Sequence, residues 1–230
     1  MVRRCTLGHS DVGHTRSRSH ARLDGDTVKT QRQTQRLARK VSARDHSLGS
    51  PLAKTTLVAY GDFASPACAQ SYRAIKKIQK EMGTRLRYVY RSFPQPEQFR
   101  HSEEVAEAAE CASSQGKFWE MHDSIFESEG PTDEIRLYRR AAEAGLDLFR
   151  FRREMRAHVH SEKIRGIRNG GVRSGVAAAP AFFINSIRYE SSFGLATLLS
   201  ALQAASGGES YRVENEVLAN RESRKTRQGA

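Results

Sequence analysis

The sequence predicts an α/β domain in which a strand–helix–strand unit precedes a block of helices and a strand–strand–helix unit. Two short runs with strand patterns, at 57–60 and 86–91, flank a segment with helical periodicity. Residues 101–173 show helical patterns almost throughout. Two further short β patterns and a last apolar helix then follow. The order alone therefore predicts a parallel strand pair with a large helical insertion.

The first unit has unusually clear local signals. The apolar strand ends at Gly61, and Ser65 is a favoured N-cap for the helix that follows. Pro66 suits the first helical position, where its missing N–H costs nothing. Gly83 is expected to end this helix. Its buried stripe repeats at spacings of three and four and consists of Cys68, Tyr72, Ile75, Ile78 and Met82.

The helical block contains at least four helical patterns. The third, after Gly130-Pro131, is expected to bury Ile135, Tyr138 and Ala142. Asp147 is a plausible cap for the fourth, which is expected to bury Leu148, Phe151, Met155 and Val159. The chain then returns to β structure at 181–184 and 187–189, before a final helix that carries Leu195, Leu198, Leu199 and Leu202.

Both ends of the chain are predicted to be tails. Residues 1–52 carry eleven Lys/Arg against four Asp/Glu, a net of +7 out of the +12 of the whole chain. Large apolar residues are sparse there, so the segment is expected to be disordered. A second disordered tail is expected over 207–230. The remaining 53–206 forms a single predicted domain.

Composition also limits the partners. No aromatic residue occurs in the first 59 positions, so nucleic-acid binding by the basic tail is not expected. No signal-peptide-like stretch or membrane-spanning run occurs, which predicts a soluble cytoplasmic protein. Three scattered cysteines, Cys5, Cys68 and Cys111, fit reduced thiols better than a disulfide framework.

Four segments in order resemble a known family. They are YGDFASPAC (60–68), VYRSFP (89–94), AAECASSQGKFWEMHD (108–123) and SGVAAAPAFFIN (174–185). Together they resemble the DsbA-like branch of the thioredoxin fold, including the domains fused to sodium/proton antiporters. The resemblance covers Thr56 to Ala204 and implies a thioredoxin-like fold with a helical insertion at about 100–173.

The resemblance also implies a site. In this family a Cys-x-x-Cys motif starts the first helix and faces a cis-proline loop. Ser65 and Cys68 stand at the two cysteine positions, and Pro180 stands at the cis-proline. Ala179 and Ala181 flank that proline where the family commonly has hydrogen-bonding residues, and Ser186 replaces a usual turn glycine. Serine cannot form a disulfide, so ordinary dithiol chemistry is excluded.

Three functions remain open on the sequence. One is weak or monothiol exchange with protein thiols or disulfides at Cys68, although burial on the helix stripe should raise its pKa. A second is a glutathione-dependent transferase or isomerase resembling the kappa class, which carries Ser in a context close to Asp62-Phe63-Ala64-Ser65-Pro66. The third is a non-catalytic peptide-binding module that uses Pro66 and the Ala179-Pro180 loop.

No metal is expected, and glutathione is the one small-molecule cofactor considered. His158 and His160 are two residues apart, which would place them on different faces of a helix. Cys111 lies in an alanine-rich helix and is interpreted as a core thiol.

Overall fold

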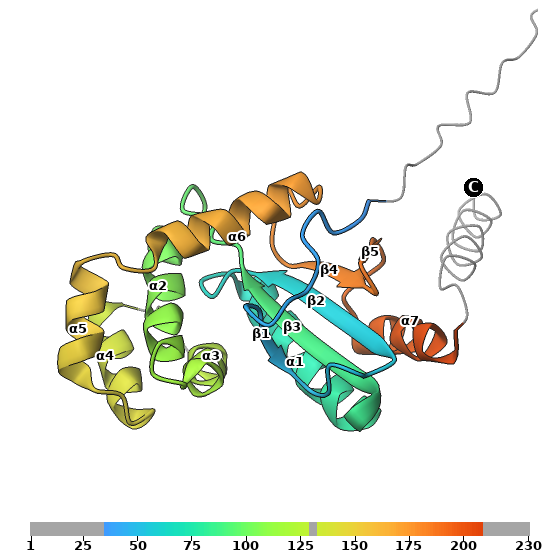
Figure 1. Ribbon diagram of the computed structural model, residues 1–230, viewed down its shortest axis with the longest axis horizontal. Helices are drawn as coiled ribbons and strands as arrows, with labels where there is room; N and C mark the ends of the chain where they lie inside the picture. Colours follow the sequence, from blue (N-terminus) through green and yellow to red (C-terminus); the bar gives the residue numbers. More distant parts are fainter. Residues whose placement is uncertain (1–34, 129–132, 209–230) are drawn as a thin grey trace, which may run out of the picture. The chain divides into compact units, whose positions relative to one another are not determined.

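The computed structural model describes residues 35–128 and 133–208 (Figure 1). Its five strands form one sheet in the order β1-β3-β2-β4-β5. The central pair β2–β3 is parallel, and each remaining pair is antiparallel. The strands are β1 (His46–Leu48), β2 (Thr55–Gly61), β3 (Leu86–Ser92), β4 (Ala181–Ile184) and β5 (Ile187–Tyr189). This is the predicted thioredoxin-like arrangement.

Helix α1 (Pro66–Met82) connects β2 to β3 and has the predicted ends. Ser65 is its N-cap, Pro66 is its first residue, and Gly83 follows its end with a φ of 52°. A short 3₁₀ turn, Gly83–Arg85, leads into β3. All five residues of the predicted stripe, Cys68, Tyr72, Ile75, Ile78 and Met82, are buried.

The sheet is covered on both faces because successive residues of β2 point to opposite sides. Leu57 and Ala59 belong to the larger core, which they share with α1 and with α7 (Leu195–Gly207). Val58 and Tyr60 belong to a smaller core on the other face, where Ile167 of α6 (Ser161–Arg173) packs. In Figure 1, α6 crosses above the sheet and α1 lies beneath it. Helix α1 also contacts the helical insertion, because the Tyr72 ring stacks on Phe126 with 5.2 Å between the ring centroids.

The helical insertion follows β3 in the predicted order. It comprises α2 (Ser102–Ser113), α3 (Phe118–Glu127), α4 (Glu134–Glu143), α5 (Leu148–Arg156) and α6 (Ser161–Arg173). Asp147 caps α5 as predicted, because its side chain accepts hydrogen bonds from the backbone N–H groups of Phe149 and Arg150.

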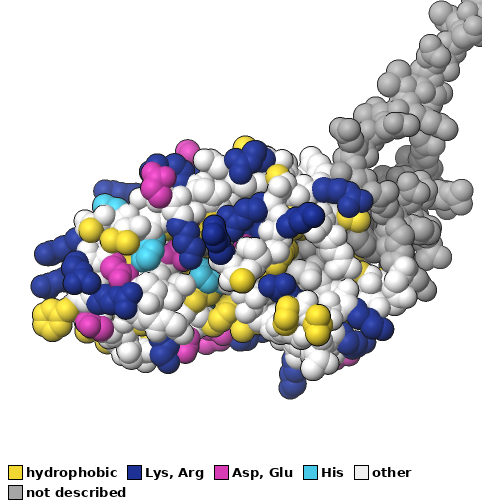
Figure 2. All heavy atoms as spheres, viewed as in Figure 1, with side chains coloured by type: hydrophobic (Ala, Val, Ile, Leu, Met, Phe, Trp, Pro, Cys, Tyr) yellow, Lys and Arg dark blue, Asp and Glu magenta, His cyan; other side chains and the backbone are white. Residues whose placement is uncertain are grey.

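The predicted faces of α4 and α5 are partly wrong. Ile135 is 82% exposed, and α4 instead buries Leu137, Arg140 and Ala141. These three residues stand at positions i, i+3 and i+4, the spacing expected of one helix face. One of them is an arginine, a residue that hydrophobic periodicity assigns to the surface. Leu148 and Val159 are also exposed, and α5 ends before Val159. Figure 2 shows apolar side chains among Lys and Arg at this end of the insertion.

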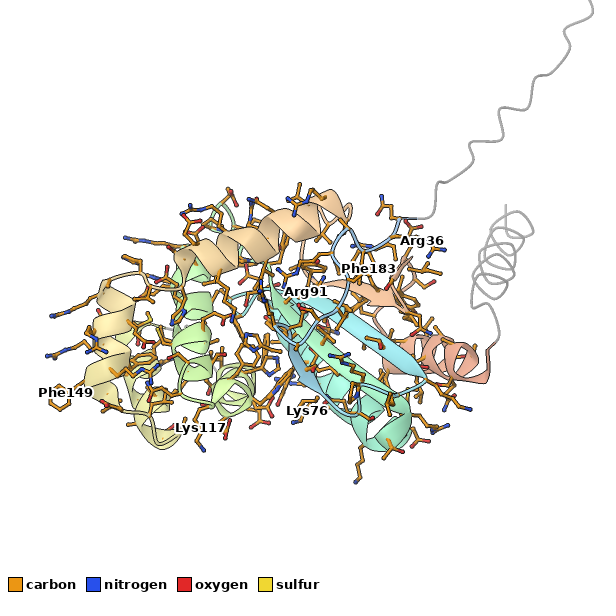
Figure 3. All side chains as sticks on the ribbon, viewed as in Figure 1. Arg36, Lys76, Arg91, Lys117, Phe149 and Phe183 are labelled. Atoms are coloured by element: carbon orange, nitrogen blue, oxygen red, sulfur yellow. The ribbon has the colours of Figure 1, made fainter. Side chains whose placement is uncertain are left out.

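The folded domain also begins earlier than the sequence predicts. Residues 35–52, assigned to a disordered tail, include β1, which pairs with β3. Leu37 and Val41 pack against the smaller core. Arg91 of β3 holds the segment: its Nε donates to Asp45 Oδ1 at 2.8 Å, and both side chains are buried (Figure 3). Polar contacts to a distant strand thus order a segment that has few apolar residues.

The remaining terminal residues, 1–34 and 209–230, lie outside the described part of the chain, so their predicted disorder stays a prediction. Among the described helices, none combines the length and apolar character that crossing a bilayer requires.

Candidate functional site

Ser65 lies at the tip of α1 and acts there as a helix cap. Its Oγ accepts a hydrogen bond from the backbone N–H of Cys68, with 3.4 Å between oxygen and nitrogen. The side chain satisfies one of the free N–H groups that every helix start exposes. Ser65 is only 4% exposed. The Ser65 hydroxyl is therefore hydrogen-bonded within the helix start and buried from solvent.

Cys68 lies in the first turn of α1 and is 3% exposed. Its Sγ accepts a hydrogen bond of 3.3 Å from the backbone N–H of Asp62. Burial raises the pKa of the Cys68 thiol to about 11, and the nearby charge of Asp62 adds to this effect. The hydrogen bonds from Asp62 and Ser65 lower the pKa but do not outweigh burial. At neutral pH Cys68 is a protonated thiol and a poor nucleophile.

Asp62 is a buried carboxylate directly after β2. Its Oδ1 accepts from Ala64 N at 2.9 Å, and its Oδ2 accepts from Gln95 N at 2.9 Å and from Ser102 Oγ at 2.6 Å. Burial raises the pKa of this carboxyl, and the three hydrogen bonds oppose the rise. Asp62 thereby joins the loop before α1 to the loop after β3 and to the start of α2.

The Ala179–Pro180 loop lies next to these groups, and its peptide bond is cis. The backbone N–H of Ala179 donates to Gln95 Oε1 at 2.7 Å. Pro180 and Cys68 line the same cavity of about 10 Å³, together with Ser71 and Tyr90. The structure therefore brings Cys68 and Pro180 together. The backbone N–H of Ser65 donates to the Asp62 carbonyl at 3.2 Å, so Asp62 and Gln95 also connect Ser65 to Ala179.

Gln95 and Ser102 belong to the site but were not predicted as part of it. Gln95 lies in the break FPQP (93–96), and Ser102 is the first residue of α2. Both are buried polar residues, a class that requires internal hydrogen-bond partners. No spacing rule joins Gln95 to Ala179 across 84 positions. Proline on both sides of a glutamine was the only local signal.

The site holds one sulfur. The described residues contain two cysteines, Cys68 and Cys111, and neither forms a disulfide. Cys111 is fully buried in α2, and burial raises its pKa to about 12, so its prediction as a core thiol is confirmed. Within the described part of the chain, Cys68 therefore has no second thiol at the tip of α1 with which to form a disulfide.

His158 and His160 bond to different carboxylates of the helical insertion. His158 pairs with Glu107, whereas His160 pairs with Glu154.

Comparison with known proteins identifies the family and the fold. Residues 42–204 match the family described as thioredoxin. The chain is 34% identical over 173 residues to the Na(+)/H(+) antiporter NhaA 1 of Salinispora arenicola, covering 75% of this chain and 26% of that protein. It is 35% identical over 168 residues to the NhaA 1 antiporter of Mycolicibacterium gilvum, covering 71% and 27%. The match thus spans about a quarter of these relatives.

Solved structures share the fold. A thioredoxin-like oxidoreductase from Silicibacter pomeroyi superposes with a TM-score of 0.64 at 24% identity, over 71% of this chain and 93% of that one. BdbD from Bacillus subtilis gives a TM-score of 0.66 at 16% identity, over 75% and 98%. Since the family match covers residues 42–204, which is most of the described domain, this chain belongs to the thioredoxin family.

Proposed function

We propose that this chain is a thiol–disulfide oxidoreductase homologue with a degenerate Ser-x-x-Cys site. Ser65 stands where the first cysteine of a dithiol would stand, and Cys68 is the remaining second cysteine. One observation carries the proposal: Ser65 caps α1 while Cys68 lies buried three residues later, against the same cavity as Pro180. A serine hydroxyl cannot attack a disulfide to form a new sulfur–sulfur bond.

The residual chemistry is that of a monothiol. Once deprotonated, Cys68 attacks one sulfur of a protein or glutathione disulfide, forms a mixed disulfide and releases the other sulfur as a thiolate. A thiol from solution, such as glutathione, then attacks the mixed disulfide and restores Cys68. Both steps are slow here because Cys68 is buried and its pKa is raised to about 11.

Restoring the missing sulfur tests the proposal. We expect Ser65→Cys to raise the rate of insulin disulfide reduction at least about tenfold, since it places a thiol at the N-terminus of α1, where the helix favours a thiolate. Ser71→Cys is a matched control. It also puts a cysteine three residues from Cys68, at a buried position, but within the helix rather than at its tip.

Comparing Ser65→Cys with Ser71→Cys shows whether the position of the added thiol decides the rate. An equal rate in wild type, Ser65→Cys and Ser71→Cys would contradict a dithiol scaffold at this helix. The monothiol step is tested by glutathionylation of wild type against Cys68→Ala after incubation with oxidised glutathione. Equal modification of both proteins, measured by mass at the peptide containing residue 68, would remove Cys68 from the mechanism.

A binding function for extended peptides has its own support. The N–H of Ala179 is bonded to a side-chain carbonyl, that of Gln95, rather than to another strand. A peptide backbone can replace such a partner without breaking the sheet. Glutathione binding at Ser65 has less support, because its hydroxyl is buried and already bonded to Cys68 N. Titration calorimetry with glutathione tests this binding.

Cytoplasmic localisation stays a prediction.

A further inference from the structure

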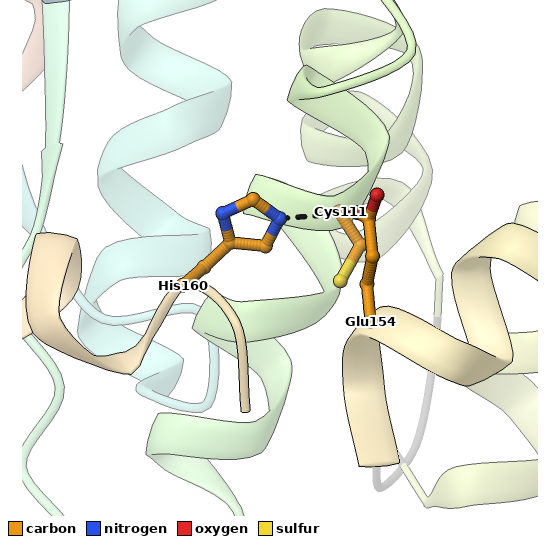
Figure 4. Close-up of side chains that lie close together, drawn as sticks. All are labelled: Cys111, Glu154 and His160. Carbon is orange, nitrogen blue, oxygen red and sulfur yellow. Dashed lines mark hydrogen bonds and ion pairs between the residues drawn. The ribbon is translucent and has the colours of Figure 1, made fainter. Parts of the chain in front are cut away.

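We propose that Cys111, Glu154 and His160 form a zinc-binding site in the helical insertion. One potential ligand atom from each residue lies within 4.8 Å of the other two (Figure 4). A thiolate, an imidazole and a carboxylate are the three protein ligand types that Zn²⁺ takes, at bond lengths of about 2.0–2.3 Å. Ligand atoms around one tetrahedral ion lie about 3–4 Å apart, so small side-chain shifts suffice.

The three residues come from separate elements. Cys111 projects from α2, Glu154 from α5, and His160 from the turn that precedes α6. Cys111 and Glu154 are buried, and His160 is partly buried. An ion here would join α2 to the α5–α6 connection. Such a cross-link between elements is what structural zinc sites provide.

Glu154 is already oriented by its neighbours. Its Oε1 accepts a hydrogen bond of 2.7 Å from Arg150 Nε. Its Oε2 accepts from Ser114 Oγ at 2.8 Å and lies 3.1 Å from His160 Nε2. Hydrogen bonds to ligating carboxylates from a surrounding shell are a general feature of metal sites. Oε2 is the carboxylate oxygen that already lies beside His160, so it is the oxygen that would bind an ion shared with this imidazole.

Binding of Zn²⁺ at this site releases one proton, that of the Cys111 thiol. The Cys111 S–H bond breaks as the sulfur–zinc bond forms, and the proton leaves to the buffer. His160 binds as neutral imidazole, and its nitrogen turns from Glu154 Oε2 to the ion. One thiolate and one carboxylate then neutralise the two charges of Zn²⁺. A water molecule supplies the fourth ligand, as in zinc sites with three protein ligands.

Cobalt substitution tests the site, because a thiolate bound to Co²⁺ gives a charge-transfer absorption that oxygen and nitrogen ligands do not. The full-length chain carrying Cys5→Ser is titrated with Co²⁺ under a phosphine reductant. We expect this absorption to appear and to vanish when Zn²⁺ is added. Histidines His9, His14 and His20 can bind Co²⁺, but without Cys5 that segment offers no thiolate.

Single variants in that background identify the ligands. We expect Cys111→Ser to abolish the band and His160→Asn to weaken Co²⁺ binding at least about tenfold. Cys68→Ala, which removes the other buried thiol, and His158→Asn, which removes the neighbouring histidine, should leave the Co²⁺ spectrum unchanged. Circular dichroism reports whether Cys111→Ser remains folded. If it unfolds, His160→Asn decides, because this side chain is only partly buried.

The proposal is wrong if the Cys5→Ser protein shows no thiolate-to-cobalt band. It is equally wrong if the band persists in folded Cys111→Ser, or if His160→Asn binds Co²⁺ as tightly as its parent. These results do not depend on the proposed redox function, since no readout involves Ser65 or disulfide exchange.

Discussion

The side-chain carbonyl of Gln95 accepts a hydrogen bond of 2.7 Å from the backbone N–H of Ala179, the residue before Pro180. The backbone N–H of Gln95 in turn donates to Asp62 Oδ2 at 2.9 Å. One buried residue therefore connects the loop at the tip of α1 to the cis-proline loop. It also occupies the donor that an incoming peptide strand would use.

Removing this internal partner should favour peptide binding. We expect Gln95→Ala to raise the affinity for a cysteine-containing peptide about two- to tenfold, which corresponds to the ~0.5–1.5 kcal/mol of one hydrogen bond. Fluorescence anisotropy with a labelled peptide measures the change. Gln98→Ala, three residues away and exposed, is the control. Equal affinities in wild type, Gln95→Ala and Gln98→Ala would show that peptides do not use the Ala179 donor.

The raised pKa of Cys68 predicts the pH dependence of its reactivity. Between pH 7 and 10 we expect the rate of Cys68 alkylation by iodoacetamide to rise about tenfold per pH unit without levelling, because the thiolate fraction grows until the pKa of about 11. Mass spectrometry of the peptide containing residue 68 measures it. A plateau near pH 8 would contradict the burial of the thiol.

The same shift affects stability. The pKa of Cys68 is higher in the folded protein than in the unfolded chain, where it is about 8.5. Its contribution to stability is therefore complete below pH 8.5 and is lost as pH rises toward 11. The difference in unfolding free energy between wild type and Cys68→Ala should shrink over this alkaline range, as measured by urea unfolding.

The ion pair of Asp45 and Arg91 should hold the N-terminal segment in place. Asp45→Asn leaves the Arg91 guanidinium buried without a counter-charge, and we expect a loss of about 3–5 kcal/mol in unfolding free energy. Arg39→Gln removes a partner of the same carboxylate that is 40% exposed, and should cost less than about 1 kcal/mol.

Limited trypsin digestion gives a second readout, because Arg39, Lys40 and Arg44 lie in this segment. Asp45→Asn should speed cleavage there before the rest of the domain is cut. If cleavage rates in Asp45→Asn and wild type match, the ion pair does not fasten the segment.

Two glycines of α6 form a matched pair. A Cβ on Gly171 would lie 2.9 Å from the Phe93 ring and 3.0 Å from the Tyr60 ring, whereas a Cβ on Gly166 meets no atom within 4 Å. We expect Gly171→Ala to destabilise by about 1–3 kcal/mol through overpacking. Gly166→Ala should stabilise by about 0.5–1 kcal/mol, since alanine favours the helix. Urea unfolding that ranks the two variants in the opposite order would refute the close approach of α6 to the sheet.

Local chemistry explains what the sequence could predict. Ser65, Pro66, Gly83 and Asp147 act through contacts with residues next to them in the chain, so the ends of α1 and the start of α5 were predictable. The order of strands and helices from β2 onward followed from hydrophobic periodicity in the same way. The family resemblance predicted that Pro180 faces the start of α1, and in the structure Pro180 and Cys68 line one cavity.

The features that escaped prediction depend on distant partners. The segment 35–52 is ordered by Arg91, 46 positions after Asp45, and its few apolar residues carry no periodic pattern. Arg140 is buried in α4 although hydrophobic periodicity assigns arginine to the surface. The contact of Gln95 with Ala179 joins a side chain to a backbone across the fold, which no local rule describes.

The short strand β1 has a consequence for how the protein behaves at high concentration. Without it, the seven residues of β3 would form an open edge, able to pair with the same edge of another molecule. His46–Leu48 covers the middle of that edge with three residues and leaves only its own short edge outside, and β5 at the opposite side is equally short. Truncation beyond residue 48 should therefore make the protein more prone to aggregate through β3.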